Sequence, residues 1–118
     1  MDAKTVAEDF TALCKAGQLD EAGEKYWSQD VKSIEPMGDM AVSDGLAAVK
    51  AKGQWWYANH EVHSVGVEGP FVNGDQFALR FDMDVTMKAN GQRMQMKEVG
   101  LYTVKDGKVV EERFFYGG

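Results

Sequence analysis

Residues 77–87 read FALRFDMDVTM, and large apolar side chains occupy every second position of this stretch. A period of two is typical of a β-strand with one apolar and one polar face. The pair Asn90-Gly91 follows, which predicts a two-residue hairpin turn into a second strand over residues 92–104. Asp106-Gly107 predicts another hairpin into a last strand over residues 108–116, and residues 62–71 predict a strand before all of these. The C-terminal half therefore predicts a run of antiparallel strands.

The N-terminal half has a different period. Apolar residues recur three or four positions apart over residues 6–14, 19–27 and 46–59, which predicts three helices. Ser43 and Asp44 are good N-cap residues for the third helix, Gly53 indicates a close packing contact inside it, and residues 31–35 predict a short extended segment. Helices followed by antiparallel strands are an α+β order, in which the helices cover one face of a single sheet. The other face then needs polar residues or a partner, which favours a homodimer through the sheet.

The composition is that of one ordinary domain. The chain has 118 residues, with 13 Lys and Arg against 19 Asp and Glu, for a net charge of −6. Because phosphate binding depends on clustered cations, this charge speaks against a nucleic-acid partner. The sequence shows neither an apolar run of membrane-spanning length, nor a signal-like N-terminus, nor a pair of cysteines. We expect a single domain over residues 1–118 that is cytoplasmic and has no membrane partner.

Methionine and aromatic residues are abundant, with seven Met, six Phe, four Tyr and three Trp. Large rings and polarisable Met side chains fill cores, but they also line apolar ligand pockets. We expect some of them to form the wall of a pocket for a small, largely apolar or amphipathic molecule. The residues expected there are Trp27, Met37, Trp55, Trp56, Phe81 and Met83.

Three short segments carry a resemblance to a known family: KYWSQDV at residues 25–31, EPMG at residues 35–38 and DGKVVEE at residues 106–112. In this order and spacing they resemble the SnoaL-like members of the nuclear-transport-factor-2-like superfamily, which includes the ketosteroid-isomerase-like proteins. The resemblance implies a cone, in which a strongly curved antiparallel sheet wraps around three N-terminal helices and a pocket opens at the wide end. Homodimers are common in that superfamily. Enzymes and binding modules share the fold, so the fold alone does not determine the function.

The segment that starts at Glu35 resembles the phrase that holds the general base of steroid delta-isomerases in this superfamily, with Glu in place of Asp. The resemblance implies a carboxylate inside the cone beside Trp side chains, where desolvation would raise its pKa toward neutrality. The alternative is a structural Glu that hydrogen-bonds a neighbouring loop. The two hydrogen-bond donors of those isomerases would correspond to Phe10 and Val99, and neither can donate. Steroid isomerase activity is therefore not expected.

A second resemblance concerns Arg80 and Asp82, since limonene-type epoxide hydrolases of the same superfamily carry Arg-x-Asp on this strand. Alternation places both side chains opposite the apolar face of residues 77–87, where an exposed ion pair is the expected arrangement. The further Asp of those hydrolases would correspond to Phe114, so the set of water-activating residues is incomplete.

Two glutamates are candidates for a place beside Glu35. The predicted two-residue turn would set Glu98 opposite Met83, on the face of Tyr102. If that face is the concave one, Glu98 and Glu35 form a carboxylate pair whose pKa values separate. If the other face is concave, Glu112 takes the place of Glu98. The apolar residues that share its face favour Glu98.

His60, His63 and Cys14 carry no predicted chemistry. The two His residues straddle the predicted end of a helix and start of a strand, and no third ligand accompanies them, so we expect no metal site. Cys14 lies on the apolar face of the first helix and is expected to be a structural thiol. No glycine-rich phosphate loop is present, and no cofactor is expected.

Two functions remain open. In the first, the protein is a cofactor-independent isomerase, lyase or hydrolase in which Glu35 is the general base and Glu98 or Tyr102 polarises the substrate. In the second, it is a non-catalytic ligand-binding or dimerisation module. The two differ in whether a hydrogen-bond donor faces Glu35 inside the cone, and the sequence identifies no certain donor.

Overall fold

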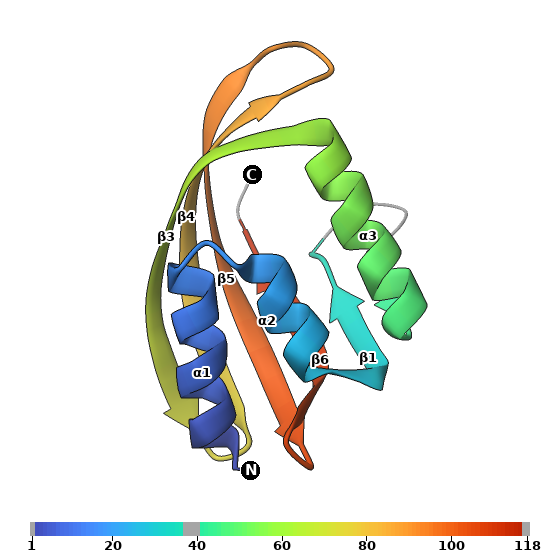
Figure 1. Cartoon of the computed structure of the whole chain (residues 1–118), viewed down its shortest axis with the longest axis vertical. Coiled ribbons are helices and arrows are strands. Elements are labelled where there is room, and N and C mark those ends of the chain that lie inside the picture. The colour runs from blue at the N-terminus through green and yellow to red at the C-terminus, as the bar shows by residue number, and fades with distance from the viewer. Residues whose placement is uncertain (1, 37–40, 117–118) are drawn as a thin grey trace.

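The structure is a computed structural model that describes residues 2–36 and 41–116. Three helices lie on one side of a curved, six-stranded sheet (Figure 1). This arrangement confirms the α+β order that the sequence predicts. The helices are α1 (Ala3–Lys15), α2 (Leu19–Tyr26) and α3 (Leu46–Asn59), and the strands are β1 (Trp27–Ile34), β2 (Val42–Asp44), β3 (His60–Asn73), β4 (Gln76–Met87), β5 (Arg93–Lys105) and β6 (Lys108–Phe115).

The strands lie side by side in the order β2-β1-β6-β5-β4-β3. Neighbouring strands are antiparallel except β1 and β6, which are parallel. The sheet is therefore mixed rather than wholly antiparallel. The reason is the path of the chain, because α3 carries it from the β2 edge to the β3 edge and the last strand returns beside β1 (Figure 1).

The third helix begins differently from the prediction. Ser43 and Asp44 belong to β2, where Ser43 pairs with Ser33 of β1, and the N-cap of α3 is Gly45. Gly53 makes no close packing contact, because a Cβ at this position would have no atom within 4 Å. Within the described residues, no helix is long and apolar enough to cross a membrane.

The β4–β5 hairpin has a longer turn than the two residues predicted. β4 ends at Met87, whose amide donates to the Gln92 carbonyl at 2.8 Å across the turn. The register is therefore shifted by two residues, so that Glu98 lies opposite Phe81 and not opposite Met83. A shift of two leaves every side chain on its predicted face, because side chains alternate along a strand.

The helices and the concave face of the sheet enclose the core. Alternate residues of β4 from Phe77 to Val85 are at most 5% exposed. Phe10 of α1 packs on Tyr102 of β5 with ring centroids 4.8 Å apart, and Phe77 stacks on the same tyrosine at 4.9 Å. Cys14 also lies in this core, where burial raises the pKa of its thiol to about 12. The aromatic contacts hold α1 against the face that carries the candidate site.

Gly23 of α2 lies against the indole of Trp27, the first residue of β1. A Cβ at position 23 would stand 2.5 Å from atoms of the indole ring, well inside the optimal separation of carbon atoms. The absence of a side chain therefore allows the indole to lie against the helix.

Gly23→Ala is expected to lower the free energy of unfolding by about 1–2 kcal/mol, because the clash with Trp27 outweighs the better helix propensity of Ala. Gly53→Ala makes the same change on α3, where space is open, and is expected to raise that free energy by about 0.5–1 kcal/mol. Urea unfolding of both variants and the wild type measures the two values. A Gly23→Ala protein as stable as the Gly53→Ala protein would contradict the contact.

Candidate functional site

The candidate site lies on the concave face of the sheet, beneath α3. Glu98 and Tyr102 of β5 share this face with Phe81 and the core, and Glu112 of β6 pairs with Tyr102. Ser33 of β1 pairs with Glu112 in turn. Polar groups from three adjacent strands therefore share one face, next to the apolar core.

Glu112 faces inward because of a β-bulge. The register of β5 and β6 shifts between Thr103 and Val104, so that Val110 of β6 is an extra residue without a partner on β5. A regular ladder would turn Glu112 outward, since one residue changes the face of every side chain that follows. The expectation that only one of Glu98 and Glu112 faces inward is therefore corrected: both do.

Lys52 of α3 supplies the cation of the site. Its ammonium lies 3.0 Å from a carboxylate oxygen of Glu35 and donates a hydrogen bond to the hydroxyl of Ser33. It also lies over the ring of Phe114, 5.2 Å from the ring centroid. The ion pair is partly shielded from water, since the two side chains are 26% and 23% exposed. Lys52 is thus the donor that faces Glu35, and no motif in the sequence indicates it.

Glu98 and Glu112 both have raised pKa values. Burial raises the pKa of Glu98 to about 7, the charge of Glu35 adds to this, and Lys52 acts in the opposite direction. Burial also raises the pKa of Glu112 to about 7, while Lys52 and the indole of Trp27 lower it. Near neutral pH each carboxyl group can therefore both hold and release a proton.

Tyr102 is the third titratable group of this face. Burial raises its pKa well above the usual value, and the charge of Glu112 adds to the effect, so the hydroxyl stays protonated near neutral pH. The hydroxyl lies against Gly100, where a Cβ would stand 2.8 Å from its oxygen. Gly100 therefore leaves room for a phenol donor on the same face as Glu98.

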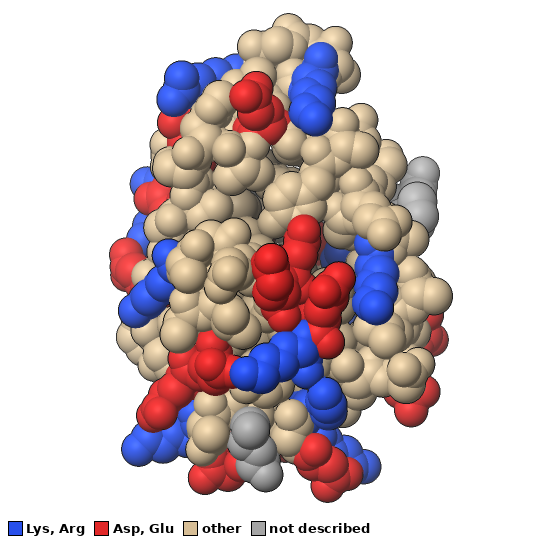
Figure 2. Space-filling view, viewed as in Figure 1, with Lys and Arg blue, Asp and Glu red and all other residues tan. Residues whose placement is uncertain are grey.

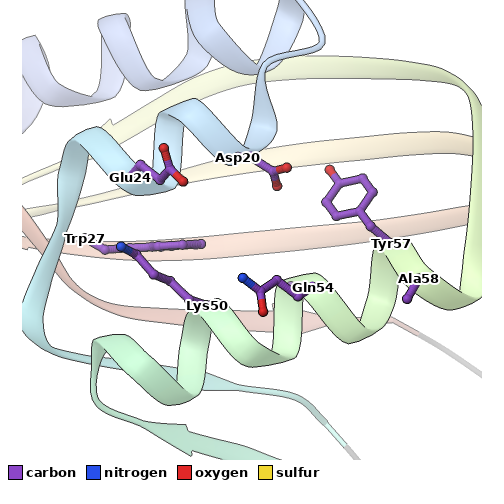
Figure 3. Close-up of a pocket in the computed structure, with 8 residues that line it drawn as sticks. Asp20, Glu24, Trp27, Lys50, Gln54, Tyr57 and Ala58 are labelled. Atoms are coloured by element: carbon purple, nitrogen blue, oxygen red, sulfur yellow. The ribbon is translucent and has the colours of Figure 1, made fainter.

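A pocket of about 450 Å³, here named the α2–α3 pocket, opens between those two helices (Figure 3). Trp27 borders it, and the indole nitrogen of Trp27 has no hydrogen-bond partner among the described residues. The same holds for Oε1 of the buried Glu112, although the indole comes close enough to lower the pKa of that carboxyl group. Trp27 thus lies between the pocket and the carboxyl groups of the sheet. The lining residues are Asp20, Glu24, Trp27, Lys50, Gly53, Gln54, Tyr57 and Ala58.

Other residues predicted to form a ligand pocket lie elsewhere. Phe81 and Met83 belong to the core, and Trp55 is 62% exposed. Trp56 stacks on the ring of His60 with centroids 4.4 Å apart. Met37 lies outside the described residues. Of the predicted set, Trp27 is the one that borders the α2–α3 pocket in the part of the chain that the structure describes.

Arg80 and Asp82 lie on the outer face, as alternation predicts, but they do not pair with each other. Arg80 forms an ion pair with Glu68 of β3 at 2.9 Å, and Asp82 accepts a hydrogen bond from Gln95 of β5. Both charges therefore hold neighbouring strands together on the outside of the sheet.

The two histidines have protein partners. His60 Nδ1 lies 2.8 Å from the carbonyl oxygen of Trp56, and His63 Nε2 lies 2.7 Å from the hydroxyl of Thr86. Across residues 2–36 and 41–116, no three His, Cys, Asp or Glu side chains are grouped as a metal site requires.

Comparison with known proteins finds similar solved structures at both high and low sequence identity. A provisionally named SnoaL-like polyketide cyclase from Mesorhizobium loti is 59% identical, with a TM-score of 0.95 over 98% of this chain and 100% of that chain. An NTF2-like protein of unknown function from Burkholderia pseudomallei is 14% identical, with a TM-score of 0.77 over 99% of this chain and 92% of that chain. A protein with a ketosteroid isomerase-like fold from Catenulispora acidiphila is also 14% identical, with a TM-score of 0.72 over 92% of this chain and 82% of that chain. None of the curated proteins compared with the chain matches it.

The structures of low sequence identity establish the fold of this chain, and the match to a family model establishes its family. The model of the SnoaL-like domain matches residues 1–116. This range includes the three segments on which the sequence-based resemblance rests. The chain therefore belongs to the SnoaL-like family and has the fold of NTF2-like proteins.

Proposed function

We propose that this SnoaL-like protein is a cofactor-independent acid–base catalyst that transfers a proton at a carbon next to a carbonyl group of a small, amphipathic molecule. The observation that supports this most is the pKa of Glu98, about 7, on a face that also holds a protonated Tyr102 and that lies beneath Lys52 of α3. A carboxyl group whose pKa lies near the working pH is suited to accept and return a proton. The relative from Mesorhizobium loti is provisionally named a polyketide cyclase, and ring closure between carbonyl compounds begins with such a proton transfer.

In this proposal Glu98 is the general base, and Glu35 is not, because Glu35 is held in the ion pair with Lys52. The C–H proton passes to the Glu98 carboxylate, and the electron pair of that bond moves to the carbonyl oxygen to form an enolate. The Lys52 ammonium and the Tyr102 hydroxyl are the groups available to stabilise this oxygen. The Glu98 carboxylic acid then returns its proton to the product.

The test is exchange of substrate C–H for deuterium in D₂O, followed by NMR with a panel of small enolisable ketones, keto esters and lactones. The wild-type rate is expected to rise with pH to about 7 and then to level off, because only the ionised form of Glu98 acts as a base. Exchange no faster than in buffer alone across the panel would count against the proposal.

Lys52→Met is expected to lower the exchange rate roughly 10- to 100-fold, because it removes the cation that stabilises the enolate. The variant should also move the pH inflection upward, since Lys52 lowers the pKa of Glu98. Lys97→Met changes an exposed residue of the same sheet and serves as the control. An unchanged exchange rate together with an unchanged pH inflection would show that Lys52 does not stabilise the enolate.

A non-catalytic ligand-binding module is the second candidate function, and the α2–α3 pocket of about 450 Å³ favours it. Ligand binding in that pocket without proton exchange at any pH would support this function instead. The two candidates are thus separated by comparing a binding measurement with an exchange measurement on the same molecules.

A further inference from the structure

The α2–α3 pocket has a chemical character that the proton-transfer proposal does not use. Asp20 and Glu24 of α2 place two carboxyl groups along one side, and Trp27 and Tyr57 place two aromatic side chains in the same pocket (Figure 3). Carboxylates attract cations, and aromatic faces bind cations that are weakly hydrated. The combination is suited to an organic cation.

The carboxyl groups of α2 repel one another. The pKa of Asp20 is raised by burial and by the charges of Glu21 and Glu24. Within the described residues, neither Asp20 nor Glu24 forms an ion pair. Figure 2 shows acidic side chains gathered over α2 at the centre of this face, with basic side chains beside them over α3 and directly below them. A bound cation would relieve the repulsion.

The two aromatic side chains lie close to carboxyl groups. In Figure 3 the hydroxyl of Tyr57 points toward Asp20, and burial, followed by the charge of Asp20, raises the pKa of Tyr57 to about 12. Trp27 lies against Gly23, so its ring cannot move closer to α2. On the sheet side of this tryptophan lies Glu112, whose carboxyl group adds negative charge beyond the ring when it is ionised. Both rings therefore offer apolar surface beside carboxyl groups, in a pocket that Lys50 also borders.

We propose that the α2–α3 pocket binds the ammonium group of a small organic cation, of which choline is the simplest probe. The carboxylates of Asp20 and Glu24 supply the charge, and the rings of Trp27 and Tyr57 supply the apolar contact. A bare metal ion fits less well, because it needs several grouped ligands and the described residues contain no such group. Lys50 also borders the pocket, and its charge opposes the bound cation.

The experiment titrates the nitrogen-15-labelled protein with choline and with 3,3-dimethyl-1-butanol, a neutral molecule of nearly the same shape. Choline is expected to shift the indole N–H signal of Trp27 and to bind at least about fivefold more tightly than the neutral molecule. The Trp27 signal is identified by its loss from the Trp27→Leu protein. Equal affinities for the two molecules, or shifts confined to the signals of Trp55 and Trp56, would overturn the proposal.

Two double variants distinguish choline binding in this pocket from a general attraction of cations to an acidic protein. Asp20→Asn with Glu24→Gln is expected to weaken choline binding about 5- to 10-fold. Glu8→Gln with Glu61→Gln removes the same charge from exposed positions outside the pocket and is expected to change it less than about twofold. Equal losses in the two double variants would overturn the proposal.

Two single variants test the pocket in opposite directions. Lys50→Met is expected to tighten choline binding about two- to threefold, because it removes the opposing charge. Gly53→Leu adds an apolar side chain at a residue that borders the pocket and where a Cβ meets no atom within 4 Å, so it should occupy part of the pocket and weaken choline binding at least about fivefold while every charge remains. Unchanged binding in the Gly53→Leu protein would place choline elsewhere on the surface.

Binding of choline does not require proton transfer. The Glu98→Gln protein is therefore expected to bind choline as the wild type does, which allows the two proposals to fail separately. If the Glu98→Gln protein loses proton exchange but still binds choline, the proposal of a choline site in the pocket stands. If the Asp20 and Glu24 double variant loses choline binding but keeps proton exchange, the proposal that Glu98 is the base stands.

Discussion

Glu98→Gln is expected to lower the rate of substrate proton exchange roughly 10²- to 10⁴-fold, the range supplied by a positioned general base. Gln has nearly the same shape as Glu but cannot accept a proton at neutral pH. The fold should tolerate the change, because the Glu98 carboxyl group, with a pKa of about 7, is already neutral in half of the molecules near that pH. The measurement is deuterium exchange by NMR from pH 5 to 9, where the variant should lose both the rate and the inflection.

Glu35→Gln is the matched variant, because the resemblance of the segment at Glu35 to steroid delta-isomerases implies that Glu35 is the base. With Glu98 as the base, Glu35→Gln keeps measurable exchange and moves the pH inflection downward, since the charge of Glu35 raises the pKa of Glu98. With Glu35 as the base, Glu35→Gln abolishes exchange and Glu98→Gln does not. The pair of variants therefore decides between the two glutamates in one experiment.

Glu112→Gln is expected to raise the free energy of unfolding at pH 8 by about 3 kcal/mol and to leave it nearly unchanged at pH 4. Glu112 is 5% exposed, and its pKa is about 7 in the folded protein against an ordinary value of 4.5. Between these pH values the folded protein holds a proton that the unfolded chain releases, so wild-type stability falls as the pH rises through this range. Because Gln does not titrate, the free energy of unfolding of the variant lacks this decrease with rising pH.

Urea unfolding of the wild type and the Glu112→Gln protein at pH 4, 6 and 8 measures this effect. Glu111→Gln is the control, because it makes the same substitution at the neighbouring, less buried position, and it should change stability by no more than about 0.5 kcal/mol at any of these pH values. A gain in the Glu112→Gln protein that is equal at pH 4 and pH 8 would indicate better packing and not the removal of a buried ionisable group.

The fold could be predicted where local periodicity determines structure. The alternation from Phe77 to Met87 identified β4 and its buried face, and the helical spacing identified α1, α2 and α3. The parallel pairing of β1 with β6 could not be read from periodicity, because it joins segments almost 80 positions apart and depends on the path of the whole chain. The longer β4–β5 turn was missed since Asn90-Gly91 is only a local signal, and the Met87 and Gln92 contact closes a wider loop.

The site was predicted in part, for a related reason. Glu98 and Tyr102 were assigned to one face because parity along β5 survives a register shift of two residues. Lys52 belongs to no known motif. Its position three residues after the buried Val49 places it on the same side of α3, which is the one signal in the sequence that directs its side chain toward the sheet. The face of Glu112 could not be predicted by counting residues from the β5–β6 turn, because the bulge at Val110 changes the face of every side chain that follows it.

The bulge at Val110 has a consequence for comparing relatives of different length. A relative that lacks one residue here would still set its counterpart of Glu112 beside the counterpart of Tyr102, because the deletion removes the unpaired residue and restores a regular ladder. A gap in an alignment therefore belongs at Val110. If the gap were placed after Glu112 instead, the alignment would match this inward carboxyl group with an outward position, and relatives that share the site would be scored as lacking it.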